Sequence, residues 1–113
     1  MKIIEETGQL THVALSGDLD AAGANEISMK FIGYVTARCK PTIVDIADVS
    51  FIASVGMGML ANLSRELKDS GAALVLLNPQ QAVEEALNEM SWQKIMPIVH
   101  SRDDAFSALG SQQ

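Results

Sequence analysis

Cysteine is almost absent from this chain of 113 residues, and the sequence also lacks the features of membrane-spanning and secreted proteins. Its one cysteine, Cys39, cannot form an intramolecular disulfide and has no other metal-ligand residues at binding spacing. No apolar run approaches the roughly 20 residues that a helix needs to span a bilayer, so we expect no direct membrane insertion. Residues 1–6 lack the apolar core and cleavage site of a signal peptide. These absences favour a cytoplasmic protein.

Positive charge is also scarce. The chain has 8 Lys and Arg against 14 Asp and Glu, which gives a net charge of −6 at pH 7. Its basic residues are scattered singly, whereas a nucleic-acid-binding protein needs a basic face that neutralises phosphates. We therefore expect no nucleic-acid partner. The acidic surface suits either a basic protein partner or a simple role in solubility.

Motifs for catalysis, nucleotide binding and metal binding are missing as well. No Gly-x-Gly-x-x-Gly or Gly-Lys-Ser/Thr loop is present, and residues 56–58 are too short to form one. Ser54 lacks the Gly-x-Ser-x-Gly frame of a hydrolase nucleophile. His12 and His100 lie in strand-like segments without further ligands at metal spacing, which is typical of surface or edge histidines. We expect no enzyme, no cofactor and no metal site.

Apolar residues, by contrast, make up 48% of the chain, enough for the core of one domain. Strand-like segments alternate with helical spacing, which predicts a single α/β domain over residues 1–109 and a loose tail over 110–113. Residues 17–23 are predicted to form a loop, and Asn78 to cap the third helix. The predicted strands cover residues 2–6, 11–16, 42–46, 73–77 and 97–99, and the predicted helices begin near residues 24, 54, 79 and 102.

The most informative stretch is residues 43–60, a buried strand followed by a turn and by Ser54 at the start of a helix. The first amides of a helix have no partners within it, and the helix dipole favours negative charge there. A phosphate on Ser54 would therefore be well placed. The alternative is that Ser54 serves only as the N-cap of its helix.

Two aspartates, Asp18 and Asp20, follow the second predicted strand. If the second and third strands are neighbours in the sheet, both aspartates share a surface with Ser54. The alternative is that the aspartates only form the turn and cap the next helix. Spacing alone leaves both interpretations open.

Several segments together resemble STAS domains, the family that includes bacterial anti-sigma factor antagonists. The resemblance runs from about residue 2 to residue 109. It implies a single STAS-type domain, with a four- or five-stranded mixed sheet and helices mainly on one side. The segments that carry it are Leu15–Ala22, Val44–Ile52, Leu74–Pro79, Ile95–Val99 and Asp103–Ala105.

The resemblance also implies a function. In anti-sigma factor antagonists, the anti-sigma factor is a serine kinase of the histidine-kinase-like ATPase type. The unphosphorylated antagonist binds this kinase and frees the sigma factor, phosphorylation breaks the complex, and a serine phosphatase restores it. By this resemblance Ser54 is the candidate phosphorylation site. The implied partner-binding residues are Asp18, Asp20, Ser54, Val55, Gly56 and Met57.

The chain departs from the family motif at two positions. Where the family has Asp-Ser-Ser/Thr-Gly, Ala53 replaces the aspartate and Val55 replaces the second hydroxyl residue, so Ser54 is the one remaining acceptor. Three functions stay open. They are a partner-switching regulator, a non-switching STAS subunit of a larger assembly such as a lipid-transport complex or signalling scaffold, and an enzyme or small-ligand binder.

Trp92 is the one tryptophan of the chain and follows the third predicted helix. An indole at such a position can anchor an interface with a partner. It can equally cover the edge of the core. The sequence does not decide between the two.

Overall fold

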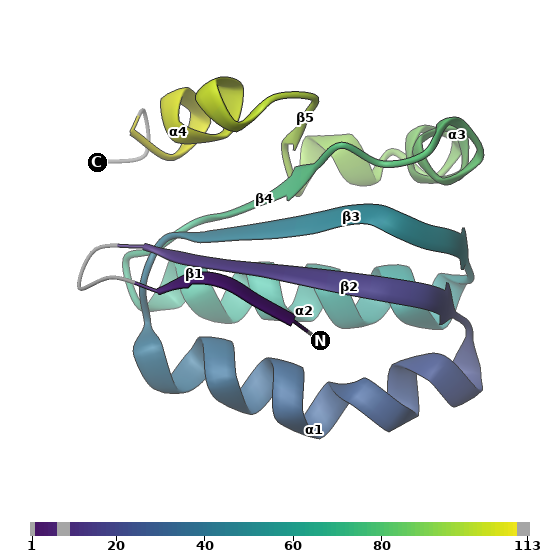
Figure 1. The fold of residues 1–113 in the computed structure, drawn as a ribbon, viewed down its shortest axis with the longest axis horizontal. Coiled ribbons are helices and arrows are strands. Elements are labelled where there is room, and N and C mark those ends of the chain that lie inside the picture. Colours follow the sequence, from purple (N-terminus) through teal and green to yellow (C-terminus); the bar gives the residue numbers. More distant parts are fainter. Residues whose placement is uncertain (1, 7–9, 111–113) are drawn as a thin grey trace.

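The computed structural model describes residues 2–6 and 10–110, which form one mixed sheet covered by helices (Figure 1). The strand order is β1-β2-β3-β4-β5. β1 pairs antiparallel with β2, and all other neighbours pair in parallel. This confirms the α/β architecture that the sequence predicts. The strands are β1 (Lys2–Glu6), β2 (Thr11–Leu19), β3 (Thr42–Ile52), β4 (Leu74–Leu77) and β5 (Ile98–Val99).

Helices lie on both faces of the sheet, but most of them pack on one face. The main core includes side chains of α1, α2 and α3. α4 packs on the face of the sheet opposite to α1 and α2 (Figure 1). In the described part of the chain, no helix has the length and apolarity needed to cross a membrane. The predicted tail lies outside the described residues except for Gly110, which belongs to α4. The helices are α1 (Ala21–Arg38), α2 (Ser54–Asp69), α3 (Gln81–Glu89), the 3-10 turn η1 (Trp92–Lys94) and α4 (Arg102–Gly110).

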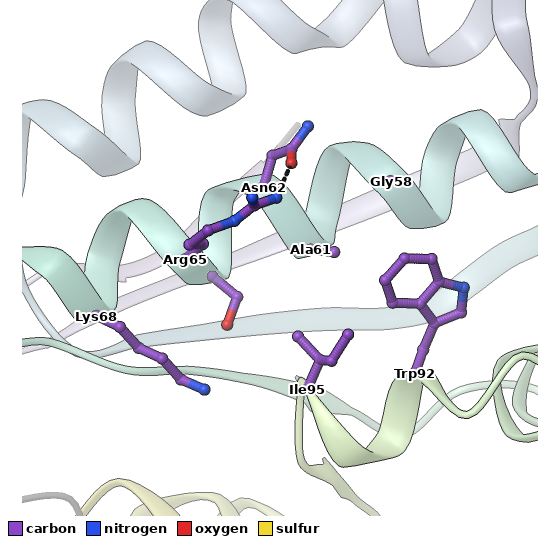
Figure 2. Close-up of a pocket in the computed structure, with 8 residues that line it drawn as sticks. Gly58, Ala61, Asn62, Arg65, Lys68, Trp92 and Ile95 are labelled. Atoms are coloured by element: carbon purple, nitrogen blue, oxygen red, sulfur yellow. Dashed lines mark hydrogen bonds between the residues drawn. The ribbon is translucent and has the colours of Figure 1, made fainter.

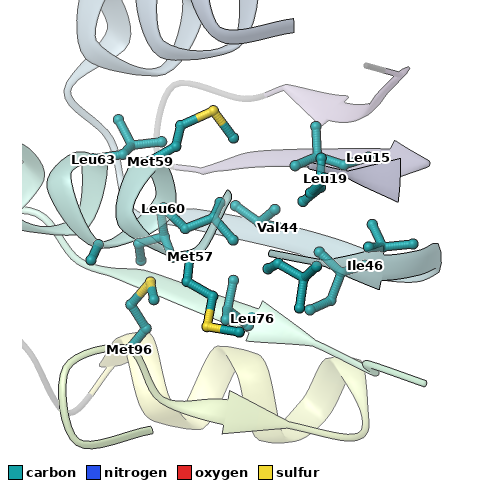
Figure 3. Close-up of a cluster of buried hydrophobic side chains, with 14 of the residues drawn as sticks. Leu15, Leu19, Val44, Ile46, Met57, Met59, Leu60, Leu63, Leu76 and Met96 are labelled. Atoms are coloured by element: carbon teal, nitrogen blue, oxygen red, sulfur yellow. The ribbon is translucent and has the colours of Figure 1, made fainter. Parts of the chain in front are cut away.

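The main core forms where α2 lies against the central strands. Successive residues of β3 point to opposite faces of the sheet, so Val44 enters the main core while Ile43 faces α4. Figure 3 shows Met57 and Leu60 of α2 pointing toward Val44 and Leu76. Leu60 is fully buried, and burying such a side chain stabilises the fold by about 1.5–3 kcal/mol. This packing fixes α2 on the sheet.

The second and third strands run further than the sequence predicts. β2 continues to Leu19 and α1 begins at Ala21, so the predicted loop over residues 17–23 is wrong. β3 likewise continues to Ile52. The cause is a pair of register shifts between β2 and β3, which allow pairing to pass through the polar residues of both strands.

The start of α3 also differs from the prediction. Asn78 is not its cap, because the helix begins at Gln81 and Gln80 is its N-cap. Asn78 adopts a left-handed φ of 58° and its amide donates to the Val99 carbonyl at 2.7 Å, so it ends β4 instead. Gln80 is held by a hydrogen bond from its Nε2 to the Ala47 carbonyl at 2.9 Å.

The first turn of α2 packs closely on the end of β2. Ala53 donates its amide to the Leu19 carbonyl at 3.0 Å. A Cβ on Gly56 would lie 2.4 Å from that same carbonyl oxygen and 2.9 Å from Leu19 Cβ. Only glycine therefore allows α2 to begin so close to β2.

We expect Gly56→Ala to lower the free energy of unfolding by about 1–3 kcal/mol, because its methyl group would push α2 away from Leu19. Gly58→Ala is the matched control, one residue further along, where an added Cβ meets nothing within 4 Å. That control should gain about 0.5–1 kcal/mol from helix propensity. Urea denaturation measures both. Equal effects of the two variants would contradict the close packing.

The two longest helices are capped differently. Asp20 caps α1, and its Oδ1 accepts from the Gly23 amide at 2.9 Å. Ala53 is the N-cap of α2 and makes no side-chain hydrogen bond. Serine, threonine, aspartate and asparagine stabilise this position because they accept from the free amides of the first turn. α2 therefore begins without this stabilisation.

We expect Ala53→Asp to raise the free energy of unfolding by about 1 kcal/mol, and Asp20→Ala to lower it by about the same amount. Ala21→Asp, exposed in the first turn of α1, controls for added charge alone. Thermal and urea unfolding of the variants measure the changes. If Ala53→Asp were no more stable than wild type, the claim that α2 lacks a stabilising N-cap side chain would be contradicted.

Candidate functional site

The candidate site lies where β2 and β3 end side by side. The strands are parallel neighbours, and Leu19 pairs with Ile52 at the end of their register. The hydrogen bond from Ala53 to Leu19 closes this edge. The sequence analysis predicts a surface shared by Asp18, Asp20 and Ser54 if β2 and β3 are neighbours. That the two strands are neighbours is confirmed. We call residues 18–20 and 53–56 together the β2–β3 edge.

The two aspartates of this edge have different surroundings. Asp18 is exposed at the end of β2, where it pairs with Phe51 across the strands. Asp20 is partly buried, and its carboxylate accepts a hydrogen bond from the Gly23 amide. The capping interpretation therefore holds for Asp20. The Asp18 carboxylate, by contrast, is at the surface and can meet a partner.

Ser54 is exposed and is the first residue of α2. The interpretation of Ser54 as the N-cap is wrong, because β3 runs on to Ile52 and Ala53 occupies the cap in an extended conformation. The Ala53 carbonyl accepts the first helical hydrogen bond, from Met57, at 3.0 Å. Because Ala53 offers no side-chain acceptor, the first amides of α2 keep their attraction for an anionic group beside Ser54.

The three residues after Ser54 divide between surface and core. Val55 is 48% exposed and extends the surface around Ser54. Gly56 is buried against Leu19, and Met57 is only 4% exposed. Met57 packs in the main core together with other α2 side chains. Gly56 and Met57 therefore support the site from beneath, whereas Ser54 and Val55 form its surface.

Sequence reasoning gave Phe51 no role in the site, although its ring is 53% exposed at the end of β3. Simple alternation would place Phe51 on the same face as the buried Val49, but the register shift after Val49 turns it outward. No pattern in the sequence signals this shift. Phe51 borders a shallow apolar pocket of about 230 Å³, lined by Ser50, Phe51, Ile52, Ala82, Val83 and Ala86.

Other candidate residues lie away from this edge. Trp92 is partly buried, packs against the main core and lines a different pocket beside α2. His12 is buried, with 4% of its surface exposed. The prediction of a surface or edge position is therefore wrong for His12, because β2 lies between β1 and β3 in the sheet. Among the described residues, no cluster of three or more His, Cys, Asp or Glu could hold a metal ion.

Comparison with known proteins supports one family. BtrV of Bordetella bronchiseptica, named as an anti-sigma factor antagonist, is 22% identical over 94 residues, which cover 83% of this chain and 81% of that protein. An anti-sigma factor antagonist from Mycobacterium paratuberculosis has a similar structure, with a TM-score of 0.82 and 25% identity over 97% of this chain and 93% of that one.

SpoIIAA of Bacillus shares the fold and has been solved in unphosphorylated and phosphorylated forms. Its TM-scores are 0.77 and 0.67, both at 21% identity. The matches cover 97% and 95% of this chain, and 96% of SpoIIAA in each case. A family model for the STAS domain matches residues 1–105. With the sheet order and the helix arrangement described above, these matches show that the chain belongs to the STAS domain family.

Proposed function

We propose that this chain is a partner-switching regulator of the anti-sigma factor antagonist type, acting in the cytoplasm. Its partner is an anti-sigma factor that is also a serine kinase of the histidine-kinase-like ATPase type. Phosphorylation of Ser54 dissociates the complex, and a serine phosphatase reverses it. The observation that carries this proposal is the exposed Ser54 at the start of α2, without a capping side chain before it. The role is binding rather than catalysis.

The surroundings of Ser54 explain how a phosphate would break a complex. Val55 and Phe51 give the surface an apolar part, and Asp18 gives it negative charge. A phosphate adds about −1.5 to −2 charges, which are costly to desolvate in an apolar interface and repel neighbouring carboxylates. The unphosphorylated face can therefore bind a partner that the phosphorylated face rejects.

A second candidate function rests on the two departures from the family motif. Ala53 leaves α2 without the aspartate cap, and Val55 removes the second hydroxyl from the first turn. A STAS subunit that stays bound within a larger assembly, such as a lipid-transport complex, needs the binding face but no phosphate acceptor. In that function Ser54 remains unmodified and the same face contacts a constant partner.

We expect Ser54→Asp to weaken binding of the kinase partner at least about tenfold, a loss of about 1.4 kcal/mol. The partner is captured from lysate of the source cells with wild-type protein as bait, then produced in pure form and titrated by calorimetry. Ser54→Asn is the matched control, because it has nearly the same size as aspartate and no charge. It should bind within about threefold of wild type. All three proteins should be folded, and Ser54→Asp should be up to about 1 kcal/mol more stable, because its carboxylate lies at the N-terminus of α2.

Equal affinity for wild type and Ser54→Asp would remove Ser54 from the mechanism and favour the assembly function. Equal losses in the Asp and Asn variants would make Ser54 a steric contact rather than a switch. Phe51→Ala tests whether the exposed Phe51 ring belongs to the binding face that either function needs. An unchanged affinity of Phe51→Ala would exclude the Phe51 ring from the interface.

A further inference from the structure

A second surface feature lies between α2 and η1, further along α2 than the β2–β3 edge. It is a pocket of about 230 Å³ (Figure 2). A cavity of roughly 150 Å³ suffices for a benzene molecule, so this pocket has room for a small organic ligand. Its lining residues are Gly58, Ala61, Asn62, Ser64, Arg65, Lys68, Trp92 and Ile95.

One side of the pocket is apolar. Figure 2 shows the six-membered ring of Trp92 turned toward Ala61 and Ile95, with its ring nitrogen pointing away from them. Ile95 is 41% exposed although it is a large aliphatic residue. These three side chains can cover the body of an apolar ligand that water would otherwise surround.

The other side of the pocket is positively charged. Arg65 and Lys68 line it from α2, and Arg65 donates a hydrogen bond to Asn62, another lining residue. A neighbouring pocket of about 180 Å³ shares Lys68 and Ile95 and adds Lys94. Among the described residues that line the two pockets, none is acidic, although the chain carries 14 Asp and Glu. Three of its 8 basic residues therefore gather at one place in an acidic protein.

A buried hydroxyl completes the arrangement. Ser64 lines the pocket and is only 1% exposed, yet its Oγ has no hydrogen-bond partner in the part of the chain that the structure describes. A serine inside a helix commonly either points to solvent or donates to the carbonyl four residues earlier. A buried hydroxyl without a partner costs stability, and a ligand acceptor in the pocket would remove that cost.

From these three observations we infer that the pocket binds a small organic anion with an apolar body. The body lies against Trp92 and Ile95. The anionic group lies between Arg65 and Lys68 and accepts a hydrogen bond from Ser64. A carboxylate or a phosphate head fits this chemistry equally. The site is separate from Ser54, so it does not depend on the proposed function.

Octanoate is a suitable probe because it combines an eight-carbon body with a carboxylate. Trp92 is the one tryptophan of the chain and lines the pocket, so its fluorescence reports binding directly. We expect octanoate to change the Trp92 emission saturably and to raise the melting temperature. 1-Octanol, which has the body without the charge, should bind at least about tenfold more weakly. Octyl phosphate compares the two head groups, and inorganic phosphate tests the head alone.

Variants test the role of each group. Arg65→Gln combined with Lys68→Gln should weaken octanoate binding at least about tenfold and leave 1-octanol binding unchanged. Lys30→Gln, an exposed position on α1, is the matched control and should bind as wild type. Ser64→Ala should weaken octanoate binding severalfold, yet raise the melting temperature of the ligand-free protein, because it removes the unpartnered hydroxyl.

Equal binding of octanoate and 1-octanol would overturn the anion site, as would the absence of any saturable change in Trp92 emission. The same conclusion would follow if the Arg65 and Lys68 double variant bound octanoate like Lys30→Gln. A Ser64→Ala variant with raised stability and unchanged octanoate affinity would show that the hydroxyl faces the core only. None of these results bears on the kinase partner.

Discussion

The parallel pairing of β2 with β3 determines where every residue of the candidate site lies. At its end, the amide of Ala53 donates to the carbonyl of Leu19, and Gly56 packs against that same carbonyl. The chain then turns directly into α2, whose apolar side chains fill the core beneath. Because position 56 has no side chain, the start of α2 lies directly against the end of β2, close in sequence to Asp18. The contact between Gly56 and Leu19 thus links the exposed residues of the candidate site to the main core beneath them.

Much of the fold could be predicted because its apolar pattern is regular. The spacing of Leu60, Leu63 and Leu67 predicts α2, and the apolar run over residues 74–77 predicts a buried strand. The lengths of β2 and β3 could not be predicted, because register shifts carry their pairing through polar residues. Asn78, Pro79 and Gln81 have the residue types and spacing of a helix start, but the hydrogen bond from the Asn78 amide to Val99 places Asn78 at the end of a strand.

Only those parts of the candidate site could be predicted that follow from the order of strands along the chain. Asp18 and Ser54 each follow a strand, so adjacent strands bring them to one edge. Phe51 was missed because a register shift decides its direction. The hydroxyl of Ser64 was missed because its lack of a partner is a property of the packed structure. The two proposals place separate features on α2, a partner-binding face at its first turn and an anion pocket along its later turns.

Phosphopeptide mapping tests the central claim most directly. Wild-type protein is incubated with its captured kinase partner and ATP, and mass spectrometry locates the phosphate while gel filtration follows the complex. We expect a single phosphate on Ser54, appearing together with dissociation of the complex. A complex that persists with Ser54 unmodified, or a phosphate at another residue, would contradict a switch at the start of α2.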